Sequence, residues 1–204
     1  LGNDPSGTTS TAQYNVAVGS GALDASSTGD GNIAIGYNTL SIATSMYDNT
    51  AVGANALAAC QASKNTAVGK DAGLIVGTGS SNTVVGYHAG DSLGSVNHNT
   101  AIGANALGLT TTASGNTACG ENAGGSLVGG AQNVFVGKTT NASATGGDNQ
   151  IVIGYSIVGK GDDTGFMDAN GGANYAGNNS ASWSTTSDRR IKKNITDNNI
   201  GLAE

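Results

Sequence analysis

Short phrases of alternating apolar and small residues recur along the chain, each starting with an amide side chain and closing with glycine. The clearest pair is NTAVGANAL at 49 and NTAIGANAL at 99, which differ by one Val-to-Ile exchange. Nine such phrases begin at residues 15, 32, 49, 65, 82, 99, 116, 133 and 150. The intervals are seventeen residues, with a single one of sixteen between 49 and 65. A period this strict indicates a repeat architecture whose units stack on their neighbours.

Each phrase predicts one short β-strand followed by a turn. The amide residue is counted as position one. β-Branched residues then occur at positions two and four in nearly every phrase, and alanine occurs at position three in most of them. Side chains alternate between the two faces of a strand, so we expect positions two and four to face a core. We expect the small alanine face to be covered as well. Glycine at position five suits a sharp corner. Each repeat therefore predicts one coil of a β-solenoid.

The stack predicts a rod and a column of amides. Neighbouring strands lie about 4.8 Å apart, so nine coils make a rod of roughly 40 Å. The position-one residues would then form a hydrogen-bonded amide ladder. A simple preference of asparagine for turns is the alternative interpretation. Gln150 replaces asparagine in the last copy and keeps the amide, which favours the ladder.

The predicted core is thin, being made of valine, alanine and a few leucines. A single coil stack would leave its alanine face in water, so we expect identical chains to pack these faces around a shared axis. The fold prediction is thus all-β: a β-solenoid (parallel β-helix or β-roll) of about nine 17-residue coils, assembled as a homotrimeric fibre.

Composition narrows the classes of function. The 34 glycines and single proline would suit a disordered chain, but the apolar residues at position four of every phrase argue for a buried structure. The net charge of −6 and the pI near 4.6 have the wrong sign for nucleic-acid binding. No apolar run is long enough for a membrane helix, so membrane insertion is not expected.

Catalytic and metal-binding patterns are absent from the repeats. Cys119 occupies position four, while Cys60 lies in a return loop four coils earlier, about 19 Å away, so both are predicted to be free thiols. His88 and His98 fall at unrelated positions of neighbouring coils and predict no metal site. The acidic residues are scattered and form no catalytic pair. No cofactor is predicted.

The pattern ends after Gly159. The predicted organisation is a lead-in (1–14), a solenoid shaft (15–159), a Gly/Asn-rich junction (160–186) with the only tryptophan, Trp183, and a C-terminal segment (187–204). That segment begins SDRRIKKNI and holds four of the eight basic residues within five positions. On charge alone, this cluster predicts a solvated surface or an anion-binding patch.

The stretch WSTTSDRRIKKNI, preceded by repeats of the NTAVG kind, resembles a junction found in bacteriophage tail fibres and tailspikes. There the shaft meets an endosialidase-type intramolecular chaperone domain, which holds three chains together while the shaft folds and then cuts itself off. The resemblance implies cleavage between Thr186 and Ser187, with Ser187 as nucleophile and Lys192 as its base. A serine hydroxyl needs such a base, and lysine serves when burial lowers its pKa.

One departure qualifies the resemblance. The family's chaperone continues as a body with long helices, whereas this sequence ends at Glu204. Without that body nothing lowers the pKa of Lys192, so we expect the Thr186–Ser187 bond to stay intact in this chain.

The function expected from the resemblance is a fibre shaft in the virion that helps attach the phage to a host receptor, either a glycan or an envelope protein. The first alternative is a bacterial trimeric adhesin head at the cell surface, whose repeats also use NxxAIG phrases. The second is a polysaccharide-degrading tailspike, which would need convergent carboxylates. The variable return loops at 41–48, 74–81 and 91–98 are the first places to expect ligand contacts.

Overall fold

The computed structural model describes residues 11–42, 44–168, 173–177 and 184–185. Within these residues the secondary structure is all β, in one sheet whose twelve strands follow chain order. The strands are β1 (Val16–Val18), β2 (Ile33–Ile35), β3 (Thr50–Val52), β4 (Thr66–Val68), β5 (Thr83–Val85), β6 (Thr100–Ile102), β7 (Thr117–Cys119), β8 (Val134–Val136), β9 (Ile151–Gly154), β10 (Gly165–Asp168), β11 (Asn174–Ala176) and β12 (Ser184–Thr185).

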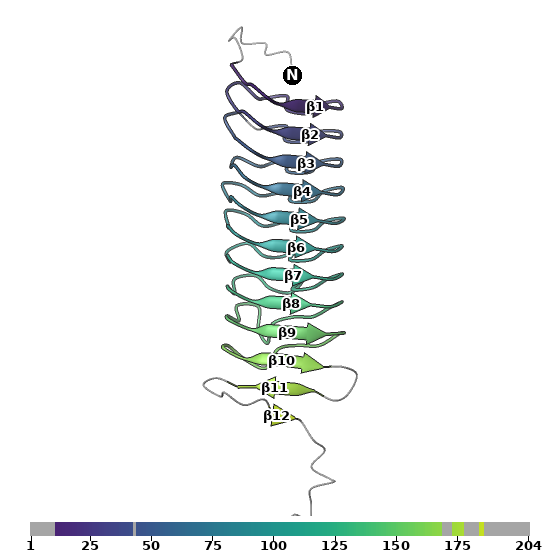
Figure 1. Ribbon diagram of the computed structural model, residues 1–204, viewed down its shortest axis with the longest axis vertical. Coiled ribbons are helices and arrows are strands. Elements are labelled where there is room, and N and C mark those ends of the chain that lie inside the picture. Colours follow the sequence, from purple (N-terminus) through teal and green to yellow (C-terminus); the bar gives the residue numbers. More distant parts are fainter. Residues whose placement is uncertain (1–10, 43, 169–172, 178–183, 186–204) are drawn as a thin grey trace, which may run out of the picture.

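The repeats form a parallel β-solenoid, as the period predicts. Strands β1 to β10 pair parallel, and equivalent positions are partners: Thr83 opposes Thr100 and Val85 opposes Ile102. The strands lie one above another along a rod, with the return loops beside them (Figure 1). Each strand is three residues long in most coils, shorter than the five-residue phrase, because glycine turns the chain at position five.

The amide ladder is confirmed, and each asparagine also closes its own coil. Asn99 donates from Nδ2 to the carbonyl of Ala113, fourteen residues on (3.0 Å). Its Oδ1 accepts from the backbone N–H (2.9 Å) and from Nδ2 (3.3 Å) of Asn116 in the next coil. The same pattern recurs along the column, whose members from Asn32 to Asn133 are at most 1 % exposed. The ladder thus pairs polar groups that would otherwise be buried without partners.

The ladder ends at Gln150. Its backbone N–H still donates to Oδ1 of Asn133 (2.8 Å), but its longer side chain turns to the backbone and hydroxyl of Ser143. The amide is kept, as the sequence indicated. However, its side-chain oxygen accepts from Ser143 and not from a backbone N–H of the following coil.

Glycine at position five is required by both backbone conformation and stacking. Gly103 has φ of +130°, and a Cβ added there would lie 2.5 Å from the carbonyl oxygen of Gly120 in the next coil. Real Cβ atoms do not approach a carbonyl so closely, so the column can only be glycine.

The prediction for the two strand faces is wrong. The alanines at position three point into the solenoid, where Ala51, Ala67 and Ala101 are fully buried. The residues at positions two and four point outward, and Val18 is 56 % exposed. The interior is narrow, and leucines such as Leu57 and Leu107 on the wall that follows the turn fill it. Only a small side chain fits opposite them, so the expected packing of alanine faces between chains is excluded.

Glycine at position nine leaves room for the large position-three side chains Val84 and Phe135. A Cβ on Gly124 would lie 2.9 Å from the ring of Phe135 and 2.6 Å from Leu107. A Cβ on Gly90 would similarly lie 2.7 Å from Val84. A larger side chain at position three is therefore compensated by a glycine beside it, which keeps the core close-packed.

The coil stack continues past the last repeat into the segment 160–186. There β10 pairs parallel with β9, and Phe166 stands in register with Val152 and is 5 % exposed. Lys160 covers the Phe166 ring, with Nζ 4.5 Å from the ring centroid. The sheet then turns antiparallel through β11 and β12.

Both cysteines are free thiols, as expected, but the expected burial of Cys119 is wrong, because position four faces outward. Cys60 of the return loop is fully buried, and Cys119 of position four is exposed. Burial raises the pKa of the Cys60 thiol, although a hydrogen bond to the carbonyl of Ala62 opposes the shift.

Candidate functional site

The site implied by the family resemblance lies outside the described residues. Thr186, Ser187 and Lys192 belong to 186–204, as do the other basic residues of SDRRIKKNI. The cleavage chemistry therefore stays a prediction from the sequence.

One surface of the solenoid is the strand face, defined here as positions two and four of the nine repeats. Its members are valine, isoleucine, threonine and one cysteine, with no charged side chain. They are Val16, Val18, Ile33, Ile35, Thr50, Val52, Thr66, Val68, Thr83, Val85, Thr100, Ile102, Thr117, Cys119, Val134, Val136, Ile151 and Ile153. Parallel, in-register pairing aligns them in two rows along the rod. Eight of the twelve valines and isoleucines are exposed, for example Val68 (39 %) and Ile102 (42 %), and the other four are half-buried.

Tyrosines and ion-paired residues border the strand face at position six. Tyr37, Tyr87 and Tyr155 are exposed there. Lys138 at the same position bonds Glu121 of the coil before it (2.9 Å), and this bond raises the pKa of Lys138. An apolar centre with a tyrosine-containing polar border is typical of protein interfaces.

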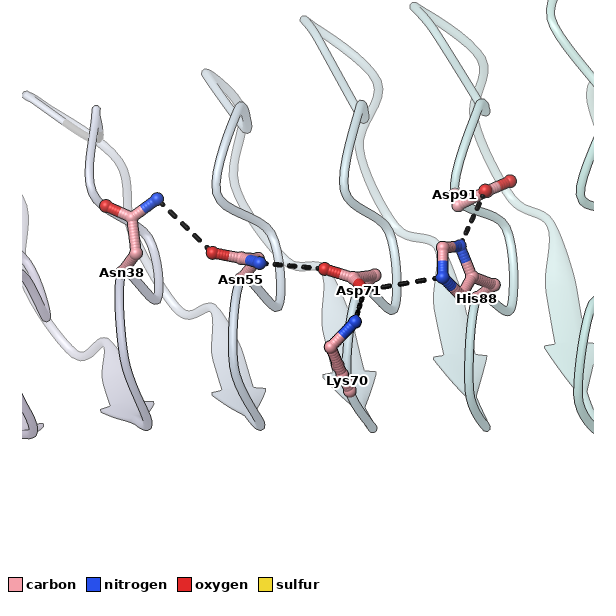
Figure 2. A network of polar contacts seen from close by, with 6 residues as sticks. All are labelled: Asn38, Asn55, Lys70, Asp71, His88 and Asp91. Carbon is pink, nitrogen blue, oxygen red and sulfur yellow. Dashed lines mark hydrogen bonds and ion pairs between the residues drawn. The ribbon is translucent and has the colours of Figure 1, made fainter.

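A polar cluster crosses the coils beside this border, at position seven. The side chains of Asn38, Asn55, Asp71 and His88 follow one another along the rod (Figure 2). Asn55 donates to Asp71 (2.8 Å), and the link from Asn38 to Asn55 is longer (3.4 Å). All four have φ between +52° and +57°, a conformation that asparagine and aspartate tolerate better than most residues.

Asp71 is the centre of the cluster and is buried. Lys70 donates to Asp71 Oδ2, and His88 Nε2 lies 3.3 Å from the same oxygen. The bonds from Lys70 and then Asn55 lower the pKa of Asp71, and the carboxylate raises the pKa of Lys70.

His88 lies between two carboxylates (Figure 2), because its Nδ1 is 3.0 Å from Asp91 Oδ2. Only the doubly protonated ring donates to both carboxylates, and a neutral tautomer donates to one. Tyr87 packs edge-on against the ring, with centroids 4.2 Å apart. Each carboxylate is thus engaged by a cation or a donor, which suits a structural ion-pair network.

Sequence reasoning missed this cluster, although a signal was present. Position seven is asparagine in Asn38, Asn55, Asn105 and Asn122, and the neighbouring substitutions Asp71 and His88 introduce a complementary pair into that column. A comparison of substitutions in adjacent repeats would have found it.

The three return loops singled out from the sequence are partly structural. Met46, Val76, Leu93 and Val96 point into the core, whereas Ile42, Tyr47 and Ile75 are exposed. Ligand contacts through these loops would use only the exposed subset.

Further searches of the described residues give two negative findings. No group of three or more His, Cys, Asp and Glu side chains is arranged to hold a metal ion. No helix in the same residues has the length and apolarity to cross a membrane.

Comparison with known proteins found no matching family model, no matching curated protein and no matching solved structure.

Proposed function

We propose that this chain forms part of the shaft of a bacteriophage tail fibre. In this role it is a structural and adhesive rod within a homotrimer, located in the virion, that helps to present receptor-binding surfaces to the host cell. The observation that carries the proposal is the uninterrupted stack of coils, which makes a stiff spacer with ten parallel strands in register. The likeness of WSTTSDRRIKKNI to the shaft–chaperone junction supports it.

Maturation would occur by one self-cleavage of the full-length protein. Ser187 Oγ would attack the carbonyl carbon of Thr186 while Lys192 accepts the hydroxyl proton. Lys192 would then deliver this proton to the amide nitrogen of Ser187, which leaves as an amine while the acyl group passes to oxygen as an ester. Water would hydrolyse the ester and free the C-terminal segment. The shaft itself has no catalytic role in this scheme.

The partner at the host surface would be a glycan or an envelope protein. Exposed loop side chains such as Ile42, Tyr47 and Ile75 offer apolar contacts for either class.

A bacterial adhesin head is the second candidate, because NIAIG at 32 and NTAIG at 99 resemble the NxxAIG phrases of such heads, with one residue instead of two between the asparagine and AIG. Those heads lead into a neck and a heptad coiled coil, and residues 160–204 carry no heptad pattern. The polysaccharide-degrading tailspike has less support, since both Asp71 and Asp91 are engaged by His88.

Intact mass under denaturing conditions tests the proposal. The natural full-length protein and its Ser187→Ala variant would be compared. Splitting before Ser187 in the wild type alone supports the phage fibre. Two unsplit proteins would overturn self-cleavage and place the adhesin head level with the tail fibre.

A further inference from the structure

A tyrosine, a carboxylate and an amide meet on the surface between coils five and six, which begin at residues 82 and 99. The Tyr87 ring packs edge-on against His88, and Nδ1 of His88 lies 3.0 Å from Asp91 Oδ2 (Figure 2). A Cβ added to Gly108 of coil six would lie 3.4 Å from Asp91 Oδ1 and 3.4 Å from the backbone carbonyl oxygen of Asn105. Tyr87, Asp91 and Asn105 therefore form one surface, named here the Tyr87 patch.

The Tyr87 ring has an aromatic face available to a ligand. The residue is 52 % exposed. Lys70 of the coil before lies over the ring, with Nζ 5.4 Å from the centroid. The same position of the coil after holds Ala104, whose side chain ends at Cβ and covers little of the ring. The faces of an aromatic ring are electron-rich and attract C–H groups such as those along one side of a sugar ring.

The two polar members of the Tyr87 patch have hydrogen-bonding capacity left. Asp91 Oδ2 contacts His88, while Oδ1 has the Ser92 hydroxyl at 3.4 Å, a long and weak contact. An ionised carboxylate can accept about four hydrogen bonds. The side-chain amide of Asn105 makes no hydrogen bond within the part of the chain that the structure describes, although its backbone N–H donates to the Tyr87 carbonyl (2.9 Å). Asp91 can thus accept from a ligand hydroxyl, and Asn105 can both donate and accept.

Tyr37 of coil two occupies the same position as Tyr87 and is also exposed, but it lacks these partners. Ser41 stands where coil five has Asp91. The amide of Asn55, which corresponds to Asn105, already donates to a carboxylate (2.8 Å). Tyr37 thus offers a ring without the two polar groups, which makes it a matched comparison within the same chain.

We propose that the Tyr87 patch is a subsite for one uncharged sugar ring of a host glycan. This inference rests on the proposed function, since it takes a glycan as the partner at the host surface. The C–H side of the sugar stacks on Tyr87, neighbouring hydroxyl groups bond the Asn105 amide, and another hydroxyl donates to Asp91 Oδ1. The Asp91 carboxylate repels the carboxylate of an acidic sugar, and the chain's net charge of −6 acts in the same direction.

The patch lies outside the strand face, because Asn105 at position seven and Asp91 at position ten belong to the wall that follows the turn. A shallow surface of this kind binds a single sugar weakly. In the proposed homotrimer each chain contributes one copy, so a host surface that carries many glycans would be bound through several copies at once.

Ligand-observed saturation-transfer NMR on the purified chain tests the subsite. The uncharged probes are the methyl glycosides of glucose, galactose and mannose, together with N-acetylglucosamine. Glucuronic acid and N-acetylneuraminic acid serve as acidic comparisons. At least one uncharged probe is expected to bind, with the strongest transfer to its ring C–H protons, and the acidic probes are expected to bind more weakly.

Four variants locate the binding. Tyr87→Ala, which introduces the residue found at this position as Ala104, should weaken binding at least about tenfold. Asp91→Ser and Asn105→Gly should each weaken it about threefold or more, because each removes a hydrogen bond to the sugar. Tyr37→Ala is the matched control and should bind like the wild type. Circular dichroism should show all four variants folded.

The outcomes are separable from those of the mass experiment. Failure of every uncharged probe to bind the folded wild type overturns the subsite, as does an equal loss in Tyr87→Ala and Tyr37→Ala. Preference for the acidic probes overturns the assignment of an uncharged sugar. Cleavage before Ser187 without sugar binding retains the fibre function and rejects the subsite. Sugar binding at Tyr87 without cleavage retains the subsite and overturns self-cleavage.

Discussion

Asn99→Ala tests whether the amide ladder stabilises the rod. The substitution removes the acceptor of the Asn116 backbone N–H and the donor to the Ala113 carbonyl, both within the buried column. Leaving a buried polar group without a partner costs about 1–3 kcal/mol. The two groups together predict a loss of about 2–6 kcal/mol, a large share of the 5–15 kcal/mol typical of folded proteins.

The assay is chemical denaturation followed by circular dichroism, with hydrogen exchange to locate the change. Protection should fall first in the coils around Asn99 and Asn116, since stacked repeats interact only with their neighbours. Asn105→Gly is the matched control, because Asn105 is exposed and its φ of +55° suits glycine. If Asn99→Ala lies within about 0.5 kcal/mol of the wild type, the ladder reasoning is refuted, because that is the scatter of ordinary surface substitutions.

Three further predictions follow from other contacts. Gly103→Ala is expected to prevent folding because the new Cβ would collide with the Gly120 carbonyl, and a normal circular dichroism spectrum would contradict the stacking geometry. Phe135→Ala introduces the usual residue of position three, yet should cost about 3–5 kcal/mol in denaturation experiments, since Gly124 leaves the space unfilled; a neutral result would count against compensation by glycine. Because the folded-state pKa of Asp71 is lowered, its stabilisation is present above the ordinary carboxyl pKa of about 4 and is lost as the pH falls through the lower folded-state value. Melting temperatures from pH 6 to pH 2 should therefore fall less in Asp71→Asn than in the wild type, and equal slopes would reject this account.

The sequence predicted the coil and the ladder because both depend on residues that recur at a fixed period. The position-one asparagines and position-five glycines have one structural role each, and the spacing alone predicts that role. Spacing does not predict whether a valine such as Val68 lies inside or outside the solenoid. Hydrophobicity places Val68 in the core, but the interior is already filled from the opposite wall, so alanine is the residue that fits.

For the candidate sites too, the sequence predicted the recurring positions but not the directions of their side chains. The strand rows were found in the sequence, and only the coordinates revealed that they face outward. Substitutions at position seven pointed to the Asp71–His88 pair, but the contact of His88 with Asp91 could not be predicted, because it depends on side-chain directions at a corner with positive φ. Cys119 was assigned to the core through the same inversion, although its free thiol was correctly predicted.

The amide ladder allows the rod to differ in length while every buried amide keeps its hydrogen-bond partners. Each asparagine from Asn32 to Asn133 offers the next coil an acceptor at Oδ1, and most of them bring the same two donors, the backbone N–H and Nδ2, to the coil before. A whole repeat inserted or deleted between size-matched coils leaves every amide paired, so the rod lengthens or shortens in steps of about 4.8 Å. Gln150 marks the end of the amide ladder, because its side-chain oxygen accepts from Ser143 instead of from the following coil, although the stack itself continues into β10. The length of the rod can thus change by copying or deleting whole repeats, with no change at either end.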